Sequence, residues 1–310
     1  MTRPGIHLAA AAPRSITAGR SRRKLVSRST PRLCRSRRGA SSTTNGYIVK
    51  VPAVAQTLRV LEMLAGAPEG QRVSHVAEEL GVNKAIAHRI LQTLVADGYV
   101  RKDNITDAYV ATFRLGALGL RQVETAGLQR WAQGTLDALA CKTQELVRLA
   151  IASGPHLQWV AKSQGSNSRL ILDPASGADA VLHATASGKA WLATLAEQDA
   201  ESLIAEATSQ TPRTETNVTR LRRILREARR NGYAITLEEM DPGVNAIAAP
   251  IFGDGPELPA TGTVSIAGPA SRLGESELLS FMPDLLEAAN ELSVSWPAYR
   301  YLKQQDRLAE

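Results

Sequence analysis

Apolar residues between positions 52 and 112 recur first at helical spacing and then in alternation, which predicts three helices followed by a hairpin. The first helix follows Pro52, a residue suited to a first helical turn, and stops before the turn-forming sequence GAPEG. Its apolar residues stand three or four positions apart: Val54, Leu58, Leu61 and Leu64. We expect this helix to support the two that follow.

The next segment, 73–98, predicts a short helix, a turn and a longer helix. Ser74 is expected to cap the short helix, and Gly81 to end it in the left-handed conformation. Asn83 is expected to cap the longer helix, whose apolar face comprises Ala87, Ile90, Leu91, Leu94 and Val95. Residues 99–102 and 108–112 then alternate as the strands of a polar hairpin. This order is the layout of a winged helix-turn-helix, which favours double-stranded DNA as a partner.

The polar face of the longer helix supplies the first candidate functional residues. Arginine and glutamine can form paired hydrogen bonds with base edges, whereas lysine acts mainly as a point charge. On the hairpin, Arg101 and Lys102 are placed to contact phosphates. The less specific alternatives are a solvated helix face and an exposed basic pair. The candidate DNA-contacting residues are Ser74, Lys84, Ala85, His88, Arg89, Gln92, Arg101 and Lys102.

Beyond position 114 the pattern changes to that of a mixed domain. Residues 115–142 are helical in pattern, with apolar anchors at Leu118, Leu128, Trp131, Leu136 and Leu139. Strands are predicted at 145–152, 157–162, 170–172, 232–238, 244–252 and 261–267. Helices are predicted at about 197–208, 219–231 and 275–293. Together these elements indicate an α+β fold.

Several segments resemble, in order, the IclR family of bacterial transcription regulators. They are VPAVAQTLRVLEML, LGVNKAIAHRILQTLVADGYV and FRLGALGL within 51–120, LHATASGKAWLA (182–193), RRNGYAITLEEMDPGVNAIAAPIF (229–252) and GTVSIAGPASRL (262–273). The resemblance spans about residues 48–295 and implies a DNA-binding regulator, not an enzyme. It implies a winged helix-turn-helix domain (48–113), a linker helix (114–127) and a GAF-like effector-binding domain (128–296). The segments 1–45 and 297–310, outside the resemblance, are expected to be tails.

The segment HATASGKAWLA also has chemistry of its own. Small residues at the start of a helix let backbone N–H groups approach a ligand, and the positive end of the helix favours an anion. The alternative is that small residues only allow close packing. The family resemblance implies a pocket for a small organic acid, formed by this segment and two late strands. Carried over by position, its residues are Ala186, Ser187, Gly188, Val244, Ala246, Ser265 and Ala267.

The chain departs from the family pattern at several of these sites. Many members have Ser-Thr where Ala85-Ile86 stands, so the DNA sequence that is read does not transfer. Many also have Arg-Cys where Asn245-Ala246 stands and a serine where Ala267 stands. Because the pocket loses polar groups, we expect an acid that is bulkier or more apolar than the smallest keto acids.

Charge is distributed unevenly along the chain. Of 37 basic residues, 11 lie within positions 1–45, where no acid occurs, so the remainder has 26 basic against 30 acidic residues. The formal charge of +7 therefore belongs to this segment, and the rest carries −4. We expect residues 1–45 to be a disordered basic tail. It contains Ser21-Arg22-Arg23 but lacks the apolar run of an export signal. Two interpretations stay open: a nonspecific DNA-binding arm, or an extension from a misassigned start codon.

Other classes of protein find less support in the sequence. No phosphate loop of the GxxxxGK[ST] type and no GxSxG motif is present, and the five histidines lack metal-ligand spacing. Glu238, Glu239 and Asp241 are expected to form a solvated acidic loop, and Cys141 to be buried or inert. A fused enzyme or a ligand-independent dimeric DNA-binding protein remains as an alternative. We expect a cytoplasmic homodimer or homotetramer with no cofactor, no metal and no membrane span.

Overall fold

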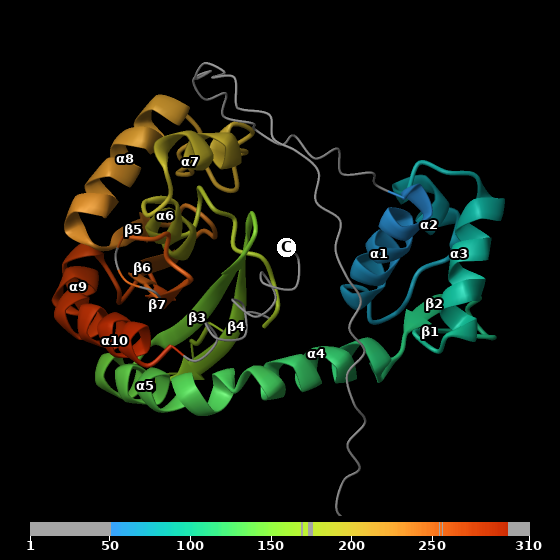
Figure 1. Cartoon of the computed structure of the whole chain (residues 1–310), viewed down its shortest axis with the longest axis horizontal. Helices are drawn as coiled ribbons and strands as arrows, with labels where there is room; N and C mark the ends of the chain where they lie inside the picture. Colours follow the sequence, from blue (N-terminus) through green and yellow to red (C-terminus); the bar gives the residue numbers. More distant parts are fainter. Residues whose placement is uncertain (1–50, 169, 173–175, 254, 256, 297–310) are drawn as a thin grey trace, which may run out of the picture. The chain divides into compact units, whose positions relative to one another are not determined.

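The computed structural model describes residues 51–296, except for 169, 173–175, 254 and 256. The expected tails at 1–45 and 297–310 therefore lie outside the described residues. The described chain comprises a helical N-terminal domain, a connecting helix and a mixed C-terminal domain (Figure 1). No helix in this described part is long and apolar enough to cross a membrane.

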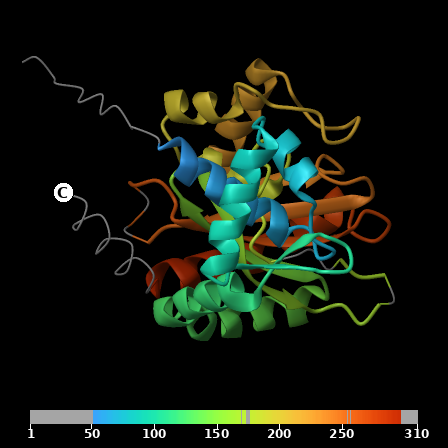
Figure 2. The same ribbon diagram turned by 90° about the vertical axis from the view of Figure 1, so that its right-hand side faces the viewer.

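The N-terminal domain is the predicted winged helix-turn-helix. Its helices are α1 (Pro52–Ala65), α2 (Val73–Glu79) and α3 (Lys84–Ala96), and β1 (Val100–Lys102) pairs with β2 (Tyr109–Ala111) in an antiparallel hairpin. Figure 2 shows α1 in blue and α3 in cyan, with the blue-green hairpin extending beside them. One apolar cluster joins all three helices to the hairpin.

The turn between α2 and α3 has the chemistry expected from its sequence. Gly81 adopts a left-handed backbone with φ of +62°, and the Asn83 side chain accepts the backbone N–H of Ile86 at 2.9 Å. The predicted apolar face of α3 is packed inward, with Ala87, Ile90, Leu91 and Leu94 buried and Val95 partly buried. The polar face is therefore left toward solvent.

The predicted buried face of α1 was partly wrong. Val54 and Leu58 are each 55% exposed, whereas Val60 and Leu64 are buried against α3 and the hairpin. Helical spacing alone is satisfied by either set, because α1 carries apolar residues on two sides. The outer set has no covering element among the described residues of the N-terminal domain.

The predicted cap at Ser74 was also wrong. Helix α2 begins one residue earlier, after Arg72, and no side chain caps it. Gln71 forms two backbone hydrogen bonds with Tyr109, at 2.9 and 2.8 Å. This pairing holds the chain extended up to the point where the helix starts, so tertiary contact and not a capping side chain sets the boundary.

The connecting helix is α4 (Phe113–Ala126), and Gly127, with φ of +68°, separates it from α5 (Leu128–Thr143). Thr112 caps α4 by accepting the backbone N–H of Arg114 at 3.4 Å. Leu118, one of the expected apolar anchors, is 41% exposed, whereas Leu136 and Leu139 on α5 are buried. The apolar pattern of α4 is thus not used for packing within the described chain.

The C-terminal domain is built on one antiparallel sheet of five strands in the order β4-β3-β7-β6-β5. The strands are β3 (Leu146–Ser153), β4 (His156–Gln164), β5 (Ala234–Leu237), β6 (Val244–Ile251) and β7 (Gly262–Pro269). One face is covered by α5, α9 (Glu275–Ser280) and α10 (Met282–Val294), and the other by α6 (Ala186–Leu192), α7 (Glu197–Ile204) and α8 (Val218–Asn231) (Figure 1). This is the predicted α+β architecture.

Two elements of this domain differ from their predictions. Residues 170–172 are not a strand, because side chains bind their carbonyls: Arg272 donates to Leu170 at 3.0 Å and Gln164 to Leu172 at 2.8 Å. The single helix predicted at 275–293 is divided into α9 and α10 at Phe281. Pro283, in the first turn of α10, lacks a backbone N–H and its ring would clash with a carbonyl one turn earlier, which favours a break at this position.

Candidate functional site

The outward face of α3 holds most of the predicted DNA-contacting residues. Lys84, Ala85, His88, Arg89 and Gln92 are all exposed. Among the described residues, neither Lys84 nor Arg89 forms an ion pair. Both cations are thus free to meet phosphates or base edges. Ser74 is exposed in the first turn of α2.

Gln92 links α3 to the hairpin. Its side-chain amide donates to the Tyr109 hydroxyl at 3.2 Å and lies 3.5 Å from Nε2 of His88. Tyr109 itself is buried and belongs to β2. The hydrogen bond therefore connects the polar face of the helix to the hairpin. Part of the hydrogen-bonding capacity of the Gln92 side chain is thus used within the domain.

The basic residues of the hairpin are in a different situation. Lys102 forms an ion pair with Asp107 at 2.8 Å, and Arg101 lies 3.9 Å from Asp103. The hydrogen bond and the charge of Asp107 raise the pKa of Lys102. Both cations therefore already have an acidic neighbour, which a phosphate would have to displace.

In the C-terminal domain, the predicted anion-binding segment forms the start of α6, and all seven residues of this helix are buried. Thr185 caps it by accepting the backbone N–H of Gly188 at 3.0 Å. A Cβ atom at Gly188 would lie 2.3 Å from the carbonyl oxygen of Leu182. Close packing therefore explains Gly188, and one of the N–H groups expected to meet a ligand is already bonded.

The four predicted strand residues share one face of the sheet. Ala246 pairs with Ala267, and Ala248 pairs with Ser265, so these side chains point to the same side. Ala186 of α6 packs in one cluster with Ala246 and Ala248, which identifies this as the face under α6. Val244 and Ala246 are partly buried, and Ser265 and Ala267 are buried. The structure thus brings Ala186 and the strand residues to one side of the sheet.

The same face carries polar residues that sequence reasoning missed. Arg148 of β3 stands directly opposite Ser265, and its guanidinium lies 3.9 Å from the ring centroid of Trp159 on β4. Burial lowers the pKa of Arg148 to about 10, against an opposing effect of Asp241, so the side chain is charged at neutral pH. The signal in the sequence was a single arginine within the apolar strand LVRLAIA.

Four polar atoms on this face are buried and have no hydrogen-bond partner among the described residues. They are Arg148 Nε, Trp159 Nε1, Thr263 Oγ1 and Ser265 Oγ. By register Ala150 pairs with both Thr263 and Trp159, so all four groups lie on adjacent strands of the α6 face. Buried polar groups are nearly always satisfied, so this group of four needs a partner from outside the described residues.

The acidic loop after β5 is not merely solvated, contrary to expectation. Lys189, buried in α6, donates to both carboxylate oxygens of Glu239, at 2.5 and 2.6 Å. Burial lowers the pKa of Lys189, and the charge of Glu239 opposes that shift. Glu238 pairs with Arg213 at 3.0 Å and accepts the backbone N–H of Gly243 at 2.9 Å. These carboxylates hold the loop in place and are not a free catalytic pair.

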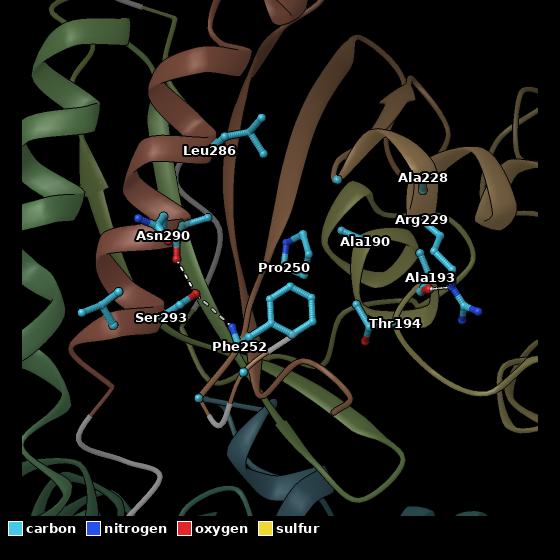
Figure 3. A pocket seen from close by; sticks show the side chains of 15 residues that line it. Ala190, Ala193, Thr194, Ala228, Arg229, Pro250, Phe252, Leu286, Asn290 and Ser293 are labelled. Carbon is cyan, nitrogen blue, oxygen red and sulfur yellow. Dashed lines mark hydrogen bonds between the residues drawn. The ribbon is translucent and has the colours of Figure 1, made fainter. Parts of the chain in front are cut away.

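A groove of about 890 Å³ opens elsewhere, at the edge of the sheet beside Pro250 and Phe252 (Figure 3). None of the seven predicted effector residues lines it. The Arg229 guanidinium is bonded to the carbonyls of Ala193 and Leu195, and the Ser293 hydroxyl is bonded to Ala289 and Phe252. Because Arg229 is already hydrogen-bonded within the protein, the groove has fewer free polar groups to bind an acid than the face under α6 has.

The described part of the chain contains few residues that could support metal or thiol chemistry. No group of three or more His, Cys, Asp or Glu residues there is arranged to hold a metal ion. Cys141, expected to be buried or inert, is exposed on α5.

Comparison with known proteins gives these features a context. The model of the IclR helix-turn-helix domain matches residues 53–104, and the model of the bacterial transcriptional regulator IclR C-terminal domain matches residues 120–294. The chain belongs to the IclR family. It is therefore a DNA-binding transcriptional regulator with a C-terminal regulatory domain of the IclR type.

Individual family members are similar over most of their length. The HTH-type transcriptional regulator BhcR of Paracoccus denitrificans is 30% identical, over 78% of this chain and 86% of that protein. The glycerol operon regulatory protein of Streptomyces coelicolor is 32% identical, over 78% and 93%. A crystal structure of an IclR homolog from Microbacterium hydrocarbonoxydans, complexed with 4-hydroxybenzoate, has a TM-score of 0.63 at 22% identity, covering 79% of this chain and 99% of that one. These relatives are regulators, and the matched domains are DNA-binding and regulatory, not catalytic.

Proposed function

We propose that this regulator binds double-stranded promoter DNA through α3 and that a small organic acid, bound on the α6 face of the C-terminal sheet, changes that binding. The observation that carries the first part is the exposed polar face of α3, on which Lys84 and Arg89 have no ionic partner within the described chain. The candidate contacts on this helix are Lys84, Ala85, His88, Arg89 and Gln92.

The remaining DNA candidates have a smaller part in this proposal. Ser74 lies at the start of α2, where an exposed hydroxyl can donate to a phosphate. Arg101 and Lys102 are placed to set the register of the hairpin on the backbone, after exchange of their acidic partners for phosphate. We assign base reading to α3 alone.

Two copies of the chain are needed on DNA, because one recognition helix covers too few base pairs for genomic specificity. Apolar surface available for self-association is present at α1, where Val54 and Leu58 in the helix and Val51 just before it are each 55–56% exposed. On α4, Phe113 is 80% and Leu120 58% exposed. We propose a homodimer or homotetramer that acts in the cytoplasm, where the chromosome lies.

A small acid as effector is supported by chemistry and by likeness. The α6 face combines a charged guanidinium with buried hydroxyls, and a homologous structure holds 4-hydroxybenzoate. The proposed contacts are Ala186, Ser187, Gly188, Val244, Ala246, Ser265 and Ala267. An acid that binds one arrangement of the dimer better than another shifts their populations, and so changes the affinity for paired half-sites.

The test for α3 compares two exposed helical arginines. In a mobility-shift assay with the promoter fragment of its own operon, Arg89→Ala should weaken binding by about tenfold or more. Arg223→Ala, on the exposed side of α8, is the matched control and should bind as the unmodified protein does. Equal affinity of all three proteins would remove α3 from the DNA interface.

The test for the effector site uses Ser187→Asp. A carboxylate at this buried position should repel an acid and abolish its effect on DNA affinity, while DNA binding without acid is retained. The measurement is the DNA affinity of both proteins across a titration of small organic acids. An unchanged dose dependence in the variant would contradict the assigned pocket.

A further inference from the structure

Arg148 is unusual among the arginines of the C-terminal domain because it is half-buried and forms no ion pair in the described chain, although the charge of Asp241 acts on it. Arg272, by contrast, makes a two-pronged ion pair with Glu145, at 2.6 and 2.9 Å, and Arg222 pairs with Glu201 at 2.6 Å. The Nε of Arg148 is buried and has no acceptor in the described chain, so the water lost there is not replaced by a protein group. Stacking on Trp159 offsets only part of that loss.

The groups around Arg148 are unsatisfied as well. Ser265 is 2% exposed and Thr263 fully buried, and neither hydroxyl has a hydrogen-bond partner in the described chain. Trp159 Nε1, a group that can only donate, is in the same position. One strand face thus combines an unpaired cation, an unpaired N–H donor and two unpaired hydroxyls.

The cation of α6 is not available. Lys189 donates to both oxygens of Glu239, so its charge is balanced within the protein. The first turn of α6 is capped by Thr185 and closely packed at Gly188. Lys162 of β4 stands opposite Arg148 by register, and among the described residues Arg148 is the cation of this face that has a buried nitrogen without a hydrogen-bond partner.

We propose that Arg148 binds the carboxylate of the effector and that Trp159, Thr263 and Ser265 bind a second oxygen of the same molecule. This rests on the proposed function, in which the α6 face is the effector site. A planar guanidinium matches a carboxylate with two parallel hydrogen bonds. The indole N–H requires an acceptor, and a hydroxyl or carbonyl oxygen of the ligand supplies one.

The alanines at 246 and 267 led us to expect a bulkier or more apolar acid, and the role proposed for Arg148 changes that expectation. On this face the polar contacts come from β3 and β4 instead of β6, and the alanines provide apolar surface for the carbon skeleton. Selectivity is then set by the oxygen substituent, because buried donors left unpaired by an unsubstituted acid penalise its binding.

The experiment measures binding by calorimetry with three matched probes: 4-hydroxybenzoate, benzoate and 4-hydroxybenzamide, with pyruvate and glyoxylate as smaller oxo acids. At least one hydroxy- or oxo-acid should bind, and removal of its charge or of its second oxygen should weaken binding about tenfold or more. Arg148→Met, which keeps much of the side-chain volume, should abolish acid binding, and Arg148→Lys should recover only part of it. Trp159→Phe, which keeps a ring but lacks the N–H, should reduce the preference for the substituted acid.

Several outcomes overturn the proposal. These are equal binding by Arg148→Met, equal binding of the acid and its amide, or no binding by any acid of the set. Thermal unfolding of each variant confirms that it is folded before it is scored. DNA affinity, measured separately with each acid, distinguishes this proposal from the proposed function. If an acid changes DNA affinity equally in the unmodified and Arg148→Met proteins, the effector function stands and the role of Arg148 is contradicted. If an acid binds only when Arg148 is present but does not change DNA affinity, the role of Arg148 stands and the effector function is contradicted.

Discussion

Neither Arg89 on α3 nor Arg148 on β3 forms an ion pair in the described chain, but they lie in opposite environments. Arg89 is exposed, so water satisfies its guanidinium and an unpaired charge costs nothing. Arg148 is half-buried against Trp159, where the same lack of a partner is unfavourable. The first suits a large polyanion that docks on a surface, and the second suits a small anion that enters the fold.

Two lysines complete the comparison. Lys189 is buried and fully paired with Glu239, whereas Lys102 is exposed and paired with Asp107. Burial sets how much a cation matters for stability, and pairing sets whether it is available to a ligand. Substitution of each cation therefore tests a different part of this relationship.

The largest effect is expected for Lys189→Met. Removal of the cation leaves the carboxylate of Glu239, only 14% exposed, without its partner. The free energy of unfolding should fall by about 3–5 kcal/mol, measured by denaturant titration. The double variant Lys189→Met, Glu239→Gln, which buries no charge, should recover most of this loss. A single variant as stable as the unmodified protein would show that the pair is not a structural anchor.

A smaller effect, on DNA recognition, is expected for Arg89→Lys. The charge remains but the paired hydrogen bonds to a base are lost, at about 1–3 kcal/mol of discrimination between the promoter and a mutated site. The salt dependence of binding should stay nearly the same, because the number of cations is unchanged. Fluorescence anisotropy at several salt concentrations measures both quantities, with Arg223→Lys as control. Unaltered discrimination together with an unchanged salt slope would assign Arg89 to a phosphate.

A change in the opposite direction is expected for Arg148→Met. Because the unpaired cation is replaced by an apolar side chain, the free energy of unfolding without ligand should increase. The expected net increase, with the lost stacking on Trp159 taken into account, is about 1 kcal/mol, measured by denaturant titration. Arg272→Met, which breaks a satisfied ion pair, is the control and should be destabilising. A destabilised Arg148→Met protein would mean that this arginine serves packing and not ligand binding.

The smallest effect is expected for Lys102→Ala. Its charge is already balanced by Asp107, so DNA affinity should change by less than about threefold. The variant Asp107→Asn should instead strengthen binding slightly, because it releases Lys102 for a phosphate. Both are measured in the same anisotropy assay. A loss for Lys102→Ala as large as that for Arg89→Ala would contradict the distinction between paired and unpaired cations.

The winged domain could be predicted well because its local signals agree with its packing. Gly81 and Asn83 specify the turn through their own backbone and side-chain chemistry. Ser74 misled because the start of α2 is set by Gln71 pairing with Tyr109, 38 positions later in the chain. The two apolar sides of α1 could not be ranked without knowing which neighbours cover them.

The proposed effector face was only partly predictable from the sequence. Family resemblance gave the residues of α6, β6 and β7, but Arg148 and Trp159 lie on strands that the resemblance did not mark. Their proximity depends on sheet order, since β3 lies between β4 and β7 although β7 is more than 100 residues later. A period-two pattern shows that Arg148 shares a strand face with Ala150, but not what covers that face.

The pairing of Gln71 with Tyr109 has a consequence for redesign of this regulator. It anchors the main chain just before α2, and the β1–β2 hairpin anchors it again after α3. The two helices form a cassette fixed at both ends by backbone contacts that no exposed side chain provides. Exposed positions of α3, such as 84, 85 and 88, can therefore be substituted without loss of the contacts that hold the two helices in place.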